Sequence, residues 1–391
     1  MRAFLKLLTL AAPLWAAACL HPAMAQPVLP RIVGTGPFLL VQPDGQVSII
    51  GELDYLPHGD GTPLRRGVRT QPKPVPGIGD AVDAAGTSEH AVVALSDGRV
   101  VGWGERCAAT GRSERNVSSP FLQPMPVAGV AGVVQVVAGK GFSAARTVDG
   151  SVLLWGERGA GRGGLVDATM DEECAAPKRL PLAGIVHIAA AQQQLLALAR
   201  DGSVWAAGAN PDGALGTGRS EEGVPPTKLP GLSDVVQLAA LGDRTVALRR
   251  DGSVWQWGHE LSERPVRVPF TGRAIAVQGY GRFAMLQAAD GSLWGWGEGY
   301  GGTFGNGSFD RVSDKPLQVP LNFRPVAWFA LNHAGFAWQP DGTLVGWGAH
   351  GFTPPGTPRR GHSVRPEPLI RWTPPAQWDS ALRPWPAQVA R

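Results

Sequence analysis

The sequence predicts an all-β fold, a closed seven-bladed β-propeller with four short strands in each blade. Two observations carry this prediction. An Asp-Gly pair occurs seven times, and each Asp is followed seven residues later by a glycine. Successive copies lie roughly fifty residues apart at five of the six steps, which is the length of one propeller blade. The pairs begin at Asp44, Asp97, Asp149, Asp201, Asp251, Asp290 and Asp341.

The Asp-Gly phrase predicts a hairpin turn that leads into a buried strand. Because Asp and Gly tolerate positive φ, we expect a two-residue type I′ turn at each copy. The strand ends at a Trp-Gly pair in five copies, and Ile50 and Ala207 replace the Trp in the other two. A Trp offers a large apolar face, so we expect it to pack between neighbouring blades. These residues are Trp103, Trp155, Trp257, Trp296 and Trp347.

Two further recurrent phrases supply the remaining strands. One is an apolar, β-branched run bounded by glycine, such as residues 134–139, and it reads as a buried strand. The other begins with proline, as at Pro124, which is tolerated at the start of a strand. Residues 31–34 match the apolar phrase alone, and residues 366–372 match the Pro-led phrase alone. We therefore expect the C-terminal strand to complete the blade begun by the N-terminus and to close the ring.

The first residues predict an export signal. Arg2 and Lys6 precede an apolar stretch that is too short to span a bilayer comfortably, and residues 23–25 form a small-x-small cleavage site. We expect residues 1–25 to be removed and the mature chain to be periplasmic or extracellular, with no membrane span. The alternative is a lipoprotein anchored through Cys19. The propeller is expected over residues 26–372, followed by a Pro- and Trp-containing tail over residues 373–391.

Charge and cysteine content limit the classes of partner. Removing residues 1–25 takes away two of the 36 Lys and Arg and none of the 32 Asp and Glu. The remaining positive excess is too small to predict nucleic-acid binding. Cys107 and Cys174 remain in consecutive repeats. An oxidising compartment would permit a disulfide between them, and two separate thiols are the alternative.

The motifs of catalysis and cofactor binding do not appear with their required context. The glycine-rich residues 159–164 follow a strand, but no helix pattern follows them, so they read as a blade loop. Residues 171–174 are acidic but lack a His at ligand spacing, which favours a solvated loop over a metal site. The chain has no nucleophile-elbow or zinc-protease motif. We expect a monomer with no catalytic residue, cofactor or metal.

The connections after the Trp-Gly strands are the expected binding elements. They are long in six repeats and short after Gly258, which predicts a low rim at the fifth blade. Variable loops on a rigid scaffold commonly carry binding, and aromatic residues and Arg are enriched in interface hot spots. The candidate partner-binding residues are Tyr55, Arg65, Arg66, Arg112, Arg115, Phe121, Tyr300, Phe304, Phe309, Phe352, Arg359 and Arg360.

One copy of the repeat also carries a family resemblance. Residues 201–218, with Asn210 and the Gly-Ala-Leu-Gly-Thr-Gly run at 213–218, resemble the regulator of chromosome condensation repeat. The resemblance covers roughly residues 28–372 and implies a seven-bladed propeller that binds proteins. The founding member of that family is a nucleotide-exchange factor for a nuclear GTPase and binds chromatin, whereas a secreted bacterial relative inhibits β-lactamases. The export signal and the missing basic arm indicate an exported bacterial member.

These observations predict an exported, non-enzymatic propeller that binds a protein or a surface polymer through the loops after its Trp-Gly strands. One alternative is an inhibitor of an extracytoplasmic hydrolase such as a β-lactamase. Another is a propeller lyase or glycosidase, which would need carboxylates from several blades to converge near the ring axis.

Overall fold

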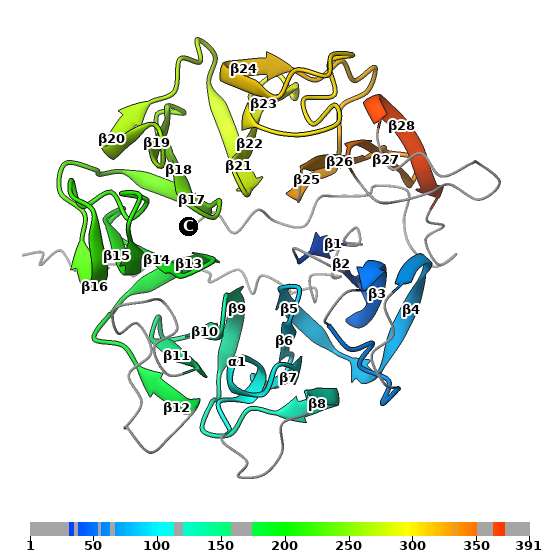
Figure 1. The fold of residues 1–391 in the computed structure, drawn as a ribbon, viewed down its shortest axis with the longest axis vertical. Coiled ribbons are helices and arrows are strands. Elements are labelled where there is room, and N and C mark those ends of the chain that lie inside the picture. Colours follow the sequence, from blue (N-terminus) through cyan, green and yellow to red (C-terminus); the bar gives the residue numbers. More distant parts are fainter. Residues whose placement is uncertain are drawn as a thin grey trace, which may run out of the picture.

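The computed structural model describes residues 31–34, 38–53, 56–62, 67–112, 120–157, 174–331, 333–349 and 363–371. Within these ranges it holds seven four-stranded antiparallel sheets arranged around a central axis (Figure 1). A short helix, α1 (Arg106–Thr110), lies between two strands of the second blade. The predicted all-β, seven-bladed propeller is therefore confirmed. The expected signal at 1–25 and tail at 373–391 lie outside the described residues.

Each blade is formed by four consecutive strands, of which the first faces the axis and the fourth lies outermost (Figure 1). The first three blades contain β1 (Arg31–Val33), β2 (Phe38–Val41), β3 (Gln46–Leu53), β4 (Gly67–Gly79), β5 (Ala81–Gly86), β6 (His90–Leu95), β7 (Val100–Gly104), β8 (Phe121–Pro126), β9 (Val133–Gly139), β10 (Phe142–Thr147), β11 (Val152–Glu157) and β12 (Cys174–Arg179).

The fourth to seventh blades contain β13 (Ile185–Ala191), β14 (Gln194–Ala199), β15 (Val204–Asn210), β16 (Glu221–Lys228), β17 (Val235–Ala240), β18 (Arg244–Arg249), β19 (Val254–Gly258), β20 (Ser262–Arg267), β21 (Ala274–Tyr280), β22 (Phe283–Ala288), β23 (Leu293–Glu298), β24 (Val312–Gln318), β25 (Ala327–Leu331), β26 (Ala334–Trp338), β27 (Thr343–Gly348) and β28 (Ser363–Arg371).

The ring closes differently from the expectation. The C-terminal strand β28 pairs with β27 and completes the seventh blade, while β1 to β4 form a complete first blade. The reason is that every Pro-led strand pairs with the Trp-Gly strand that precedes it in the chain. Closure comes instead from side-chain packing between the first and last blades, where Phe38 meets Phe336 edge-on with ring centroids 5.9 Å apart.

Apolar cores between consecutive blades hold the ring together. Seven clusters of buried residues each combine side chains from two neighbouring blades, and the last joins the seventh blade to the first. The five Trp residues of the Trp-Gly pairs are fully buried in these clusters, as predicted. Trp296, for example, donates its indole N–H to Gln256 Oε1 of the preceding blade at 2.8 Å. Burial of a side chain of this size stabilises the fold by about 3 kcal/mol.

The Asp-Gly turns are three-residue hairpin loops rather than the expected two-residue type I′ turns. Gly98 N–H donates to Leu95 O, and Leu95 N–H donates to Arg99 O. Gly98 has φ +82° whereas Asp97 keeps a negative φ, so only the glycine needs the left-handed region. The Asp carboxylate accepts the N–H two residues later in all seven copies, at 2.8–3.1 Å. This local bond explains the fixed Asp.

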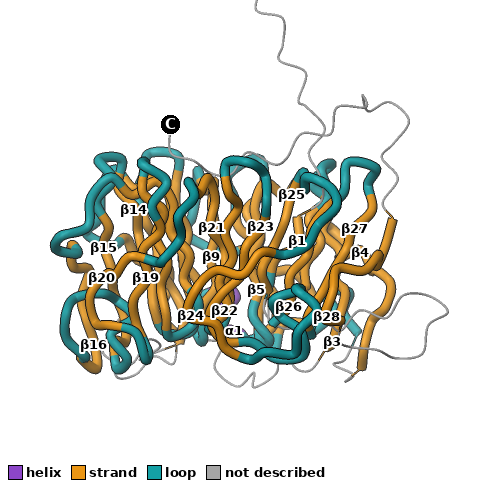
Figure 2. Tube along the Cα trace, turned by 90° about the horizontal axis from the view of Figure 1, so that it is seen from above, coloured by secondary structure: helices purple, strands orange, loops and turns teal. Residues whose placement is uncertain are grey.

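The chain connections divide between two faces of the disc, as the loops in Figure 2 show. On one face, the turn between the first and second strands of a blade lies beside the end of the Trp-Gly strand, because His90 pairs with Gly104 in register. We call this the loop face, since the connection to the outer strand also starts there. The Asp-Gly turns lie on the opposite face, which we call the turn face.

Candidate partner-binding site

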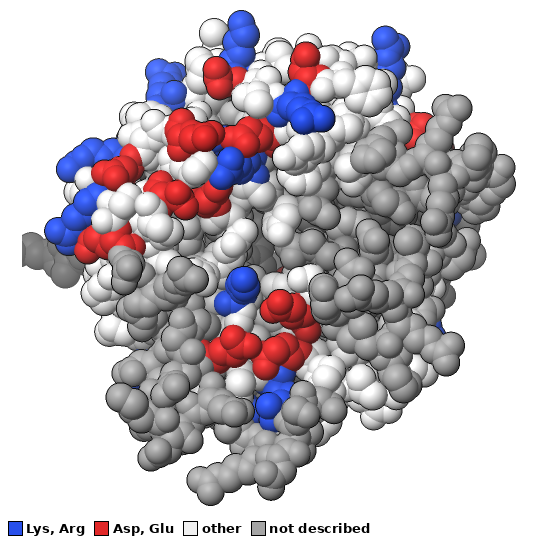
Figure 3. Space-filling view, in the orientation of Figure 1, with Lys and Arg blue, Asp and Glu red and all other residues white. Residues whose placement is uncertain are grey.

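The loop face is lowest at the fifth blade, as the sequence predicts. Only residues 259–261 connect β19 to β20, whereas residues 299–311 connect β23 to β24 in the next blade. The short connection leaves the inner turn of the fifth blade, between its first and second strands, uncovered by a long loop of its own blade. In Figure 3, acidic and basic side chains are interspersed over this part of the ring, at the upper left of the view.

A pocket of about 470 Å³ lies in this region of the loop face. Its floor comes from inner turns of four consecutive blades, and its wall comes from the long connection of the sixth blade. The inner-turn residues are Gln192, Gly242, Asp243, Gly281, Arg282 and His333, and the wall residues are Glu298, Gly299, Tyr300, Arg311 and Val312. The ring geometry therefore gathers side chains that are far apart in the sequence.

An ion-pair network fixes the floor of the pocket. Arg282 contacts Asp243 at 2.7 Å and Glu298 at 3.1 Å. Arg244, which is nearly buried, contacts Glu298 at 2.7 Å. Hydrogen bonding to Asp243 raises the pKa of the Arg282 guanidinium further. Burial alone would raise the pKa of Glu298, but the hydrogen bond from Arg282 and the charge of Arg244 outweigh it and lower this pKa. Both groups are therefore charged at neutral pH.

Exposed aromatic and aliphatic side chains lie in or directly after the connection that forms the pocket wall. Tyr300 is 55% exposed, Phe309 69% and Val312 60%. The guanidinium of Arg311 lies 5.5 Å from the centre of the Tyr300 ring, and His333 meets that ring edge-on at 4.9 Å. An aromatic residue held between two neighbours loses little freedom when it binds a partner. Tyr300, Phe309, Arg311 and Val312 are termed the aromatic rim below.

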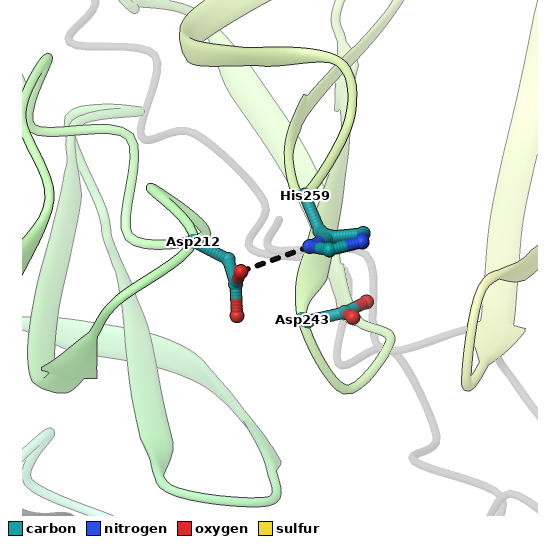
Figure 4. Close-up of side chains that lie close together, drawn as sticks. All are labelled: Asp212, Asp243 and His259. Carbon is teal, nitrogen blue, oxygen red and sulfur yellow. Dashed lines mark hydrogen bonds and ion pairs between the residues drawn. The ribbon is translucent and has the colours of Figure 1, made fainter.

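A histidine and two aspartates lie together beside the pocket (Figure 4). His259 Nδ1 is 2.8 Å from Asp212 Oδ1, and its Nε2 is 3.4 Å from Glu260 Oε1. Asp243 contributes a carboxylate from the adjacent inner turn, and its Oδ1 is buried without a hydrogen-bond partner among the described residues. Sequence reasoning missed these residues because they come from separate connections of the fourth and fifth blades.

The predicted partner-binding residues have different outcomes. Tyr300 lines the pocket and is exposed, Phe309 is exposed in the same connection of the sixth blade, and both remain candidates. Arg112 and Phe121 are half-buried in the second blade, away from this pocket. Phe121 stands at the start of β8, paired with Gly104. The candidates outside the described residues are Tyr55, Arg65, Arg66, Arg115, Phe352, Arg359 and Arg360.

Phe304 is not available to a partner, which corrects the prediction for this residue. It is fully buried in the core between the sixth and seventh blades, with its ring 6.0 Å from that of Phe283. Residues 302–307 match 213–218 in spacing, so Phe304 corresponds to Leu215, which is also fully buried. That internal alignment is the signal that would have identified Phe304 as a core residue.

Cys107 and Cys174 form a disulfide in the structure. Cys107 belongs to α1 of the second blade and Cys174 begins β12, the outer strand of the third blade. The bond therefore joins two neighbouring blades beneath the loop face. Glu105 caps α1 by accepting the N–H groups of Cys107 and Ala108 at 2.9 and 2.8 Å, which holds the first cysteine in position.

The central channel has a volume of about 640 Å³ and is lined mainly by Ala, Val and Ile of the inner strands. Asp83 is its one acidic residue among the described lining residues. That carboxylate contacts Arg31 at 2.6 Å and accepts the N–H of Val136 at 2.9 Å. Gln135 bonds the next blade in the same way, to both the N–H and the carbonyl of Ile188. The paired carboxylates that a glycosidase needs are not present among these residues.

The fold and the site define a repeat β-propeller. On one face of its ring, the connections between the third and fourth strands differ in length from blade to blade. One stretch of the ring matches a known repeat: the pattern described as Regulator of chromosome condensation (RCC1) repeat matches residues 201–248. The chain is therefore an RCC1-like repeat propeller. In the described residues, no helix is long and apolar enough to cross a membrane.

Curated relatives match part of the chain. The regulator of chromosome condensation of Mus musculus is 30% identical over 151 residues, which are 38% of this chain and 35% of that protein. The E3 ubiquitin-protein ligase HERC2 of Homo sapiens is 34% identical over 156 residues, 38% of this chain and 3% of that protein. The matched region thus spans about a third or less of these relatives.

Solved structures match over most of the ring. Human WBSCR16 superimposes with a TM-score of 0.71 at 20% identity, covering 83% of this chain and 94% of that one. Yeast RCC1 (Prp20), solved with bound Kap60, superimposes with a TM-score of 0.69 at 19% identity, covering 84% of both chains. At this level of identity the likeness concerns the fold.

Proposed function

We propose that this chain is an exported, non-enzymatic propeller that binds another protein through the loop face of its fifth to seventh blades. The observation that carries the proposal is the aromatic rim beside a charged pocket. Tyr and Arg are enriched at interface hot spots, Val312 adds an exposed apolar side chain to the pocket lining, and Phe309 is exposed in the same connection. The mixed charges on the pocket floor would select a partner by electrostatic complementarity.

The similar structures support a protein as the ligand class. Yeast Prp20 was solved with Kap60 bound, and its binding to Gsp1p and histones has been described. Its identity to this chain is 19%, so the analogy concerns the use of the ring as a binding scaffold. Export is supported by the composition of residues 1–25, and the disulfide between Cys107 and Cys174 suits an oxidising compartment.

The test is a capture experiment with a matched pair of variants. The mature chain is immobilised and exposed to periplasmic and medium proteins of the producing cell, with purified β-lactamases and proteases as a defined panel. Val312→Ser removes an exposed valine from the aromatic rim. Val148→Ser removes a 76% exposed valine from the turn face. We expect the wild-type chain and Val148→Ser to retain a specific protein that Val312→Ser loses.

Two outcomes contradict the proposal. If both variants retain the protein equally, the binding surface lies elsewhere than the aromatic rim. Recovery of no specific protein from any source would remove protein binding as the function. Inhibition of one panel enzyme by the wild-type chain would identify the partner class as an extracytoplasmic hydrolase.

A further inference from the structure

We propose that Asp212, Asp243 and His259 bind a divalent transition-metal ion between the fourth and fifth blades. One donor atom from each residue lies within 4.8 Å of the other two (Figure 4). A zinc ion holds imidazole nitrogen and carboxylate oxygen at about 2.0–2.2 Å, so its ligands are separated by roughly 3–4 Å. The Asp212 side chain is 39% exposed and has room to complete this approach.

The three ligands come from segments that the fold already holds in place. Asp212 lies in a loop whose geometry is fixed by Asn210, which accepts the N–H of Leu215 at 2.8 Å. His259 and Asp243 are joined through their backbones, since His259 N–H donates to Asp243 O at 3.0 Å. The carbonyl of His259 also accepts from Arg244 Nε at 2.8 Å. A preorganised backbone reduces the entropy that ion binding would cost.

Arg282 holds the Asp243 carboxylate by one of its two oxygens. It binds Asp243 through Oδ2, with its Nε at 2.8 Å, and so leaves Oδ1 for another donor. Among the described residues, no hydrogen-bond donor reaches this buried Oδ1. A buried carboxylate oxygen without a partner is unfavourable, and a bound cation would offset that cost. Arg282 would then be the hydrogen-bond donor that keeps a metal-binding carboxylate in position.

Local charge and ligand type indicate the class of ion. The ion-pair network around the site contains four carboxylates and two guanidiniums, so a divalent cation would balance its charge. Imidazole with carboxylate ligands favours zinc and other first-row transition ions, whereas calcium and magnesium prefer all-oxygen sites. We therefore expect zinc to bind more tightly than manganese, and calcium and magnesium to bind weakly or not at all.

The test is a calorimetric titration of the mature chain, freed of metal with a chelator and carrying no histidine tag. We expect one zinc ion per chain for the wild type. His259→Gln and Asp212→Asn should each weaken zinc binding by more than about tenfold, a loss that even second-sphere changes can cause. Asp314→Asn is the matched control, because Asp314 is exposed on β24, outside the cluster. It should retain wild-type affinity.

A second readout separates loss of the site from loss of the fold. Excess zinc should raise the melting temperature of the wild type and of Asp314→Asn, because a ligand stabilises the state that binds it, and should leave both site variants unchanged. Melting of each variant without metal reports whether it is folded. The proposal is overturned if no stoichiometric zinc binding occurs, or if His259→Gln and Asp212→Asn bind zinc as tightly as the wild type. Neither result depends on a protein partner.

Discussion

Arg311 lies over the ring of Tyr300, with its guanidinium carbon 5.5 Å from the ring centre. His333 meets the same ring edge-on from the seventh blade. The two contacts order the Tyr300 ring between the sixth and seventh blades while it stays more than half exposed. A side chain ordered in this way is suited to serve as an anchor for a partner.

Tyr300→Ala is expected to weaken binding of the captured partner by about 2 kcal/mol, roughly thirtyfold, because a central aromatic hot spot is lost. The melting temperature should change little, since the ring is more than half exposed. Binding is measured by surface plasmon resonance and folding by calorimetry. Tyr300→Phe is the control and should retain most of the affinity. Equal weakening by both variants would assign the effect to the hydroxyl group instead of the ring.

His90 predicts a specific loss of stability in acid. The fully buried ring is hydrogen-bonded to Ser143 of the next blade at 2.9 Å. Burial lowers its pKa from 6.5 to about 3. Between these values the unfolded chain binds a proton that the folded chain does not. The free energy of unfolding should therefore fall as pH drops below 6.5, by up to about 1.4 kcal/mol per pH unit from this residue.

Urea denaturation of the wild type and of His90→Gln between pH 4.5 and pH 8 checks this expectation. His187, whose pKa burial lowers to about 4, adds a similar contribution in both proteins. The variant should show the shallower dependence of stability on pH. Parallel curves would show that His90 does not carry the effect.

Gly98 should be more sensitive to substitution than a glycine of similar conformation that faces open space. Gly98 and Gly129 have φ of +82° and +77°. A Cβ on Gly98 would lie 2.7 Å from the backbone nitrogen of Gly132 in the adjoining blade, whereas a Cβ on Gly129 meets nothing within 4 Å. Gly129→Ala should cost about 1 kcal/mol from backbone strain, and Gly98→Ala clearly more. Thermal denaturation measures both, and equal costs would refute the close approach.

The disulfide should stabilise the ring as a clamp between its second and third blades. Its cysteines are 67 residues apart in the sequence. The Cys107→Ala/Cys174→Ala double variant should lose about 2–4 kcal/mol of stability under oxidising conditions. A reducing agent should destabilise the wild type by a similar amount and leave the double variant unchanged. A wild type that is insensitive to reduction would contradict this role.

The ring was predictable because each copy of the repeat carries the same kinds of residue at its turn and in its core. Asp97 caps its own turn, Gly98 supplies the positive φ, and Trp103 fills the core between two blades. Closure was harder to predict, since a Pro-led strand such as β28 could pair with either terminal blade. In the structure β28 pairs with β27 of the seventh blade. The sequence alone does not show which of the two pairings forms.

The site was predictable only in part. The short connection after Gly258 correctly located the low rim, and Tyr300 and Phe309 were identified as exposed aromatics. The charged floor was missed because Asp243 and Arg282 are 39 residues apart and meet only through the packing of neighbouring blades. Phe304 was misassigned because it was taken as a loop aromatic and not aligned with Leu215, the buried residue at the same position of another repeat.

The most direct test of a loop-face binding site is hydrogen–deuterium exchange of the chain with and without its captured partner. We expect slower exchange in residues 259–261 and 299–312 of the loop face when the partner is bound. Exchange in the Asp-Gly turns of the opposite face, such as residues 147–150, should be unchanged. Protection confined to the turn face, with residues 299–312 exchanging as in the unbound chain, would contradict it.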